Sequence, residues 1–264
     1  MTDFASFGDV HVDLDDDYVA VAEIRRPPHN YFDMHLIGSL AEAFEALDAD
    51  PRCRAILLCS EGKSFCAGAQ LGGGGGDVRP VPVSEPGRHL YDEAVRLFST
   101  RTPVVAAIQG AAVGGGLGLA LMPDFRVAAP EARFSANFAR LGFHQGFGLS
   151  VTLPDLVGQQ RAMELLYTGR RVKGEEALAL GLCDRLVSQD QLRGEAHTLA
   201  SEIAKSAPLA VASIRETLRG ELPSRIRAAT DREKVEQERL QKTADFKEGV
   251  RAMAERRTPN FQEG

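Results

Sequence analysis

Residues 110–124, GAAVGGGLGLALMPD, contain three consecutive glycines between an apolar run and an expected helix. VVAAI (Val104 to Ile108) precedes them, and its unbroken apolar character predicts a short buried strand. Glycines at a helix start let other atoms approach the backbone closely, and the first N–H groups of a helix have no partner within it. With the helix dipole behind them, these N–H groups favour an oxygen that gains negative charge. Tight packing of the helix on the strand is the alternative reason for such a glycine run.

A second glycine-containing turn comes earlier in the chain. AILLC (Ala55 to Cys59) predicts another buried strand, and SFCAGAQL (Ser64 to Leu71) follows it. If the two strands are neighbours, each turn can aim one backbone N–H at the same oxygen, which is the arrangement of an oxyanion hole.

The first half of the chain repeats a strand, a loop and a helix. VHVDL and YVAVAEI predict a hairpin, and Asp33 begins a helical pattern that stops before Asp50. A helix is also expected from Gly87 to Thr100, and FRVAA predicts a third buried strand. Such repeats indicate an α/β fold of stacked units. From Ser150 onward the pattern is almost entirely helical, and it closes with one long helix from Asp231 to about Arg257.

Composition and charge exclude several classes of partner. The 264 residues suffice for one large domain, or for one domain with an appendage. The net charge is −6 and no long basic run could follow a phosphate backbone, so we expect no nucleic-acid partner. No apolar run approaches the roughly 18 residues of a membrane span, and the acidic first residues do not form an apolar leader. We therefore expect a cytoplasmic protein that has no membrane contact.

Two nucleotide-binding motifs are absent. SEGKS resembles the end of a P-loop, but the glycine that the motif requires five residues before Gly62 is Leu57. The glycine triplet does not extend to a dinucleotide-binding motif, because the last required glycine is Leu119. The four cysteines form no CxxC and no cluster with histidine, which predicts reduced structural thiols. We expect no metal site and no organic redox cofactor.

Together these stretches resemble the crotonase superfamily, the enoyl-CoA hydratase/isomerase family. KSFCAGAQL and TPVVAAIQGAAVGGGLGLALMPDFRVAA are similar to its two signatures, and RPPHNYFD, MELLYTGRRVKGEEALALGLCDRLV and FKEGVRAMAERRTPNF are similar to its flanking segments. The resemblance covers roughly residues 10 to 261 in consistent order. It implies stacked ββα repeats with the acyl-CoA site in residues 1–195, and a helical C-terminal region, residues 196–264, that forms a homotrimer or a dimer of trimers.

The resemblance also implies the ligand and its contacts. An acyl-CoA thioester would bind with its carbonyl oxygen between the N–H groups of Ala69 and Gly115. The coenzyme A belongs to the substrate, so no separate cofactor is implied. The other residues that the resemblance places at the substrate are His29, Ala67, Gln70, Leu71, Phe138 and Arg256, the last of them a basic position in the final helix.

The sequence departs from the family at its catalytic acids. Family hydratases place two glutamates around a water molecule, one to add a proton and one to remove it. The first position is Gly118 here, and Asn137-Phe138 replaces the Pro-Glu pair that carries the second. Glycine and phenylalanine cannot transfer a proton, so we expect weak or no hydration of straight-chain enoyl-CoA.

Three interpretations stay open for the chemistry. His144, in LGFHQGFG, is the first candidate for a substitute acid or base because histidine titrates near neutral pH, and His89 is the second. An enzyme using His144 could abstract a proton next to the carbonyl or hydrolyse the thioester. Alternatively, the protein binds or senses acyl-CoA without catalysis. The aromatic residues Phe138, Phe143 and Phe147 indicate either an apolar acyl pocket or ordinary core packing.

Overall fold

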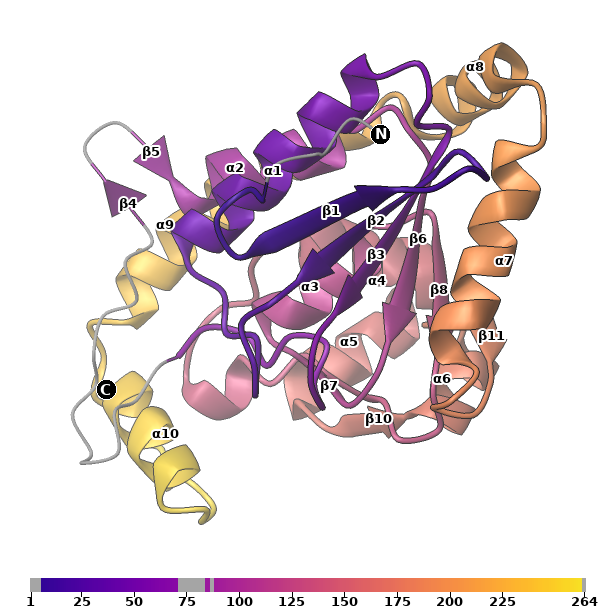
Figure 1. The fold of residues 1–264 in the computed structure, drawn as a ribbon. Helices are drawn as coiled ribbons and strands as arrows, with labels where there is room; N and C mark the ends of the chain where they lie inside the picture. The colour runs from indigo at the N-terminus through magenta and orange to yellow at the C-terminus, as the bar shows by residue number, and fades with distance from the viewer. Residues whose placement is uncertain (1–5, 71–83, 86–87, 263–264) are drawn as a thin grey trace.

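Six strands form the main sheet of the computed structural model, which describes residues 6–70, 84–85 and 88–262 (Figure 1). Their order across the sheet is β1-β2-β3-β6-β8-β11, and every neighbouring pair is parallel except the antiparallel hairpin of β1 and β2. The strands are β1 (Val10–Leu14), β2 (Val19–Ile24), β3 (Ala55–Ser60), β6 (Val104–Ile108), β8 (Phe125–Ala128) and β11 (Arg185–Leu186). The predicted hairpin and the three predicted buried strands are therefore confirmed.

A second sheet contains the short strands β7 (Ala111–Val113), β9 (Arg133–Ser135) and β10 (Arg171–Lys173). β6 leads through a turn into β7 and then into helix α3 (Gly115–Leu121); β8 leads into β9 and, after a 3-10 turn at Ala139–Leu141, into α4 (Leu149–Val157). Each unit thus contributes one strand to each sheet and then a helix. This is the stacked ββα arrangement that the resemblance implied, although the second strand of each unit was not predicted.

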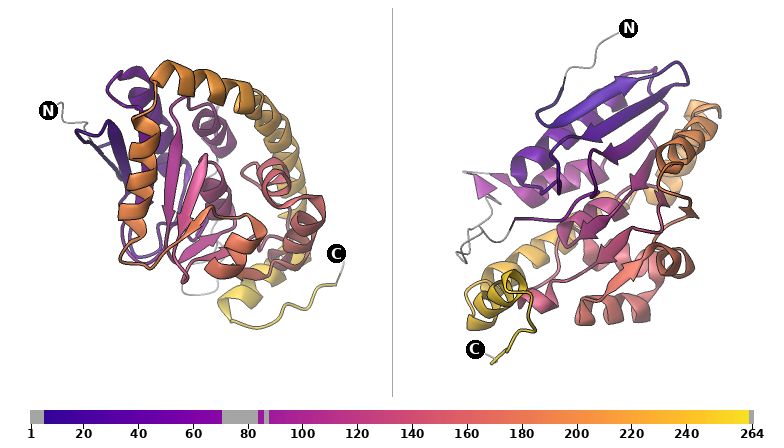
Figure 2. Two further views of the ribbon diagram at one scale, coloured as in Figure 1. Left: turned by 90° about the vertical axis from the view of Figure 1, so that its right-hand side faces the viewer. Right: turned by 60° about the horizontal axis from the view of Figure 1, so that its bottom comes forward.

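Helices cover both faces of the main sheet, which explains why its strands are apolar without alternation. Ile56 and Leu58 of β3 belong to the core beneath α1 (Met34–Ala49) and α2 (Leu90–Phe98), whereas Leu57 packs toward α7 (Leu192–Ala204) on the other face. Figure 2 shows α7 running along one face of the main sheet. The other elements that precede α7 in the chain are β4 (Ser84–Glu85), β5 (Arg88–His89), α5 (Gln159–Thr168) and α6 (Gly174–Leu180).

The C-terminal helices differ from the expectation. Instead of one helix from Asp231 to about Arg257, there are α9 (Leu222–Leu240) and α10 (Ala244–Ala254), and the Thr243 side chain accepts a hydrogen bond from Phe246 N at the start of α10. The helix expected from Gly87 begins only at Leu90. Residues 195 and 196, between which a division of the chain is expected, both belong to α7, and the division itself stays a prediction.

The C-terminal helices also differ from one another in how they pack. Ile226 of α9 is fully buried in the main core, and Phe246 and Val250 of α10 pack on Leu141. By contrast, α8 (Pro208–Arg219) has no buried residue. Within the described residues, none of the helices has the length and apolar character needed to cross a membrane.

Candidate active site

The chain between Cys66 and Ala69 lies between two other backbone segments. On one side, Cys66 pairs in parallel with Ala112 of β7, with Cys66 N donating to Ala111 O at 2.9 Å. On the other side, Ala67 N donates to His29 O at 3.0 Å, and Phe32 N donates to Gly68 O at 3.0 Å. In the parallel β-bridge between Phe32 and Ala69, the hydrogen bonds of Phe32 go to the residues on either side of Ala69 and not to Ala69 itself. The N–H of Ala69 therefore points away from Phe32, toward the side where α3 begins.

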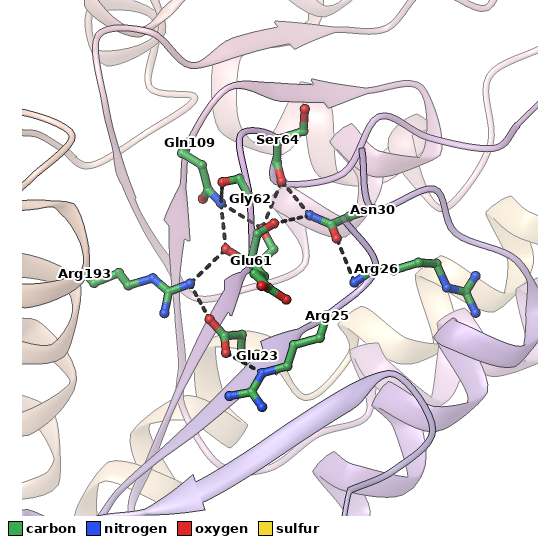
Figure 3. A network of polar contacts seen from close by, with 10 residues as sticks. Glu23, Arg25, Arg26, Asn30, Glu61, Gly62, Ser64, Gln109 and Arg193 are labelled. Carbon is green, nitrogen blue, oxygen red and sulfur yellow. Dashed lines mark hydrogen bonds and ion pairs between the residues drawn. The ribbon is translucent and has the colours of Figure 1, made fainter. Parts of the chain in front are cut away.

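Buried side-chain amides fix the loop that leads into this segment (Figure 3). Asn30 is fully buried, and its Nδ2 donates to Glu61 O at 2.8 Å and to Ser64 O at 2.7 Å. Gln109 Nε2 donates to Ser60 O at 2.7 Å. Because a buried carbonyl without a partner costs roughly 1–3 kcal/mol, these amides specify the path of residues 60–64. Neither amide was predicted to have this role, although Asn30 stands in the RPPHN segment that carried the family resemblance.

The glycine triplet makes the turn from β7 into α3. Gly114 has a φ of +58° and donates its N–H to Ser135 O at 2.8 Å. This left-handed residue turns the chain, so the N–H groups that follow it point away from Ser135. Among the described residues, no backbone acceptor pairs with the N–H of Gly115, the first residue of α3. A Cβ atom on Gly68 would lie 3.9 Å from Gly115 N, so the two predicted turns do meet.

Phenylalanine side chains occupy the neighbourhood where the family's two acids are expected. A Cβ atom on Gly118 would lie 2.7 Å from Phe147 Cβ and 2.9 Å from its Cδ1, so Phe147 excludes any side chain at position 118. A Cβ on Gly114 would lie 3.9 Å from Phe138 Cζ, which brings the Phe138 ring to the glycine turn. The rings of Phe138 and Phe143 are 5.4 Å apart, and those of Phe147 and Phe32 are 5.7 Å apart.

His144 lies in the loop between Phe143 and Phe147 and is half-buried. Its Nδ1 is 2.8 Å from the carbonyl oxygen of Gln145. A carbonyl can only accept a hydrogen bond, so Nδ1 carries the proton, and Nε2 of the neutral ring is then the basic nitrogen. The loop thus sets the tautomer that a general base requires.

The positions of the other predicted site residues give less support for a role in the site. His89 accepts from Tyr91 N through Nδ1 and forms the N-cap of α2, and burial, together with the charge of Lys234, lowers its pKa. Gln70 is exposed, and Leu71 lies outside the described residues. Arg256 is exposed but not in the final helix as predicted, because α10 ends at Ala254 and Arg256 follows it with φ +55°.

Two further observations limit the chemistry. Burial raises the pKa of the Cys66 thiol to about 12, so this cysteine beside the glycine turns is a neutral thiol and a poor nucleophile. A cavity of about 620 Å³ lies elsewhere, between α3, α4 and the α8–α9 connection, and contains none of the candidate residues. In the part of the chain that the structure describes, no three histidine, cysteine or acidic side chains cluster as metal ligands.

Comparison with known proteins relates this geometry to a family. The profile of the enoyl-CoA hydratase/isomerase family matches residues 15–264. A Thermus thermophilus protein provisionally named an enoyl-CoA hydratase is 35% identical over 254 residues, covering 95% of this chain and all of that protein. Carnitinyl-CoA dehydratase of Salmonella paratyphi A is 36% identical over 195 residues, 74% of each chain. The crystal structure of an enoyl-CoA hydratase/isomerase from Pseudoalteromonas atlantica T6c superimposes with a TM-score of 0.86 at 32% identity, covering 96% of this chain and 100% of that one.

Proposed function

Because this chain belongs to the enoyl-CoA hydratase/isomerase family, we propose that it binds an acyl-CoA thioester at the start of α3. The thioester oxygen lies between the N–H groups of Ala69 and Gly115. The observation that carries this proposal is the junction of the two glycine turns, where the N–H of Gly115 has no backbone acceptor among the described residues. Two preorganised donors of this kind stabilise the negative charge that develops on the carbonyl oxygen.

The acid–base group of this proposal is His144 rather than a pair of glutamates. Nε2 takes a proton from the carbon next to the thioester carbonyl, and the electron pair of the broken C–H bond moves to the oxygen as an enolate. Support comes from the tautomer of His144 and from its place in the loop between Phe143, whose ring contacts Phe138, and Phe147, which packs against Gly118 of α3. Proton abstraction or thioester hydrolysis then replaces ordinary hydration.

A second candidate function is binding of acyl-CoA without turnover. This function is favoured because a phenylalanine takes the place of each of the family's two acids. Phe147 occupies the space beside Gly118, the first position, and Phe138 is the residue at the second position. Under this alternative the protein keeps the oxyanion site as a recognition element.

The quaternary structure, a homotrimer or a dimer of trimers, belongs to the same proposal. Its support is α8, on which Leu209 and Leu218 are 85% and 78% exposed and Ile214 is 60% exposed in the isolated chain. Large apolar side chains grouped on one helix are typical of a surface that a partner covers. The absence of a separate cofactor and a cytoplasmic location remain predictions.

Exchange of the α-proton of butyryl-CoA in heavy water, followed by mass spectrometry, tests the function. We expect deuterium uptake with the unmodified protein and loss of uptake, on the order of 10²-fold or more, in His144→Ala. His35→Ala, which removes an exposed histidine on α1, is the matched control and retains uptake. Tight binding of butyryl-CoA with no uptake in any variant supports the binding protein instead. Neither binding nor uptake contradicts both.

A further inference from the structure

Helix α9 contacts the loop that carries His144, although the two are far apart in the sequence. Gln237 Nε2 donates to the backbone oxygen of His144 at 2.9 Å, and its Oε1 accepts from Tyr91 Oη of α2 at 2.7 Å. A Cβ atom on Gly146 would lie 1.9 Å from Tyr91 Oη, so the loop passes directly over this pair.

One turn earlier on α9, Glu233 binds the end of the same loop. It is fully buried, and its carboxylate accepts from Gly148 N at 2.9 Å, from Ser150 N at 3.1 Å and from Ser150 Oγ at 2.7 Å. It therefore caps the start of α4 from another helix. Burial raises the pKa of Glu233, whereas these donors favour its ionised form.

The loop needs such support because its backbone is unfavourable. Phe147 has φ +60° and Gly148 has φ +74°, so a bulky residue adopts the left-handed conformation at roughly 1–2 kcal/mol. Such conformations persist only where the surroundings impose them. Here the surroundings are Gln237 and Glu233 of α9, which bind the loop backbone on either side of Phe147, and Tyr91, which lies against Gly146.

We propose that Gln237 and Glu233 are positioning residues: they hold the loop that carries His144 and set its Phe147 against α3. This inference rests on the proposed role of His144. The ring of His144 is held by Gln145 O within the loop itself, so its direction follows the loop backbone, and the loop backbone is held by α9. The C-terminal region therefore completes the site of the N-terminal one. Sequence reasoning missed both residues because they lie in a strongly polar helix, DREKVEQERL, where nothing marks a buried side.

Gln237→Glu is the sharpest test. The carboxylate can still accept from Tyr91 but cannot donate to His144 O, so the hydrogen bond to the loop is replaced by repulsion between two oxygens. Gln241→Glu, at the exposed C-terminal end of α9, makes the same chemical change without that contact. We expect Gln237→Glu to lower kcat for α-proton exchange by about 10²-fold with KM changed less than about threefold, the cost of a misplaced reactive group. Gln241→Glu should leave both constants unchanged.

Hydrogen–deuterium exchange of the backbone amides is the second readout and does not depend on activity. In Gln237→Glu and in Glu233→Gln, the amides of residues 145–150 should lose protection while those of β3 and β6 keep it. Loss of exchange activity in His144→Ala together with wild-type kcat in Gln237→Glu would overturn this inference and leave the proposed function standing. Wild-type activity in His144→Ala overturns the proposed function and this inference with it. If no variant turns over acyl-CoA, unchanged protection of residues 145–150 overturns the inference, and lost protection supports the positioning of the loop by α9.

Discussion

The contact between Gly118 and Phe147 predicts how the protein responds when a side chain is returned to position 118. A methyl group added in Gly118→Ala would lie 2.7 Å from Phe147 Cβ, closer than Cβ atoms approach one another in proteins. Because the nearest obstructing atom is a Cβ, Phe147→Ala removes the contacts with Cγ and Cδ1 but leaves the closest one in place. Only Phe147→Gly removes it, and φ +60° at this position suits glycine.

Two opposing terms determine the size of the effect. Overpacking in a core costs about 1–3 kcal/mol, whereas replacing glycine by alanine inside a helix gains about 1 kcal/mol. Gly118→Ala should therefore lower the free energy of unfolding by about 0–2 kcal/mol in the wild type, and should raise it by up to about 1 kcal/mol when residue 147 is glycine. The helix term cancels in a double-mutant cycle, so the coupling energy between the two sites should be about 1–3 kcal/mol.

Urea unfolding followed by far-UV circular dichroism measures this cycle, at one protein concentration because an oligomer's stability depends on it. The cycle with Phe147→Ala is the control and should show a smaller coupling. A coupling below about 0.5 kcal/mol with Phe147→Gly, the usual error of additivity, would refute the steric explanation for the missing first acid.

Three other perturbations test different parts of the structure. A Cβ at Gly115 would lie 2.2 Å from Phe32 Cζ, so Gly115→Ala should displace the N–H donor and lower turnover on the order of 10²–10³-fold with little change in expression, measured by α-proton exchange. Hydrogen bonds from Arg257 and from Asn260 N lower the pKa of Glu248 to about 2. The stability that Glu248 contributes is therefore fully present above pH 4.5, its ordinary pKa, and is lost as the pH falls toward 2. The protection factor of the amide of residue 260, which compares its exchange rate with the intrinsic rate at the same pH, should fall over that range, and an unchanged protection factor contradicts the pairing. Leu218→Asp should shift the protein to a smaller species in size-exclusion chromatography with light scattering, and an unchanged mass would show that α8 is not the subunit contact.

Helices and strands were predictable where their sequence pattern and capping residues agree with how they pack in the structure. Asp33 caps α1 as expected, with its side chain accepting from Leu36 N at 2.9 Å, and β3 and β6 are apolar throughout because both faces are covered. β7 and β9 have three residues each, too few for any periodicity to show. Threonine is a common N-cap residue, so Thr243 marks in the sequence the start of α10, which the expectation of one long helix missed.

The candidate site was predictable only where backbone chemistry decides it. The glycines that bring the two turns together are visible in the sequence, because no other residue allows that approach. Phe147 beside Gly118 was not predictable, since its direction depends on a left-handed loop that α9 holds from far along the chain. Tyr91 is only 7% exposed for the same reason: α9 covers that side of α2.

The buried amides around residues 60–64 have a consequence for how this scaffold can diversify. Asn30 Nδ2 and Gln109 Nε2 donate to main-chain oxygens and to the Ser60 hydroxyl, and Asn30 Oδ1 accepts from Arg26 N (Figure 3). Among the described residues, neither amide is hydrogen-bonded to residues 118 or 138. The frame that presents the N–H groups of Ala69 and Gly115 thus has no hydrogen bond to either acid position. A lineage can exchange the side chain at position 138 without disturbing this frame, whereas a side chain at position 118 first requires a change at Phe147.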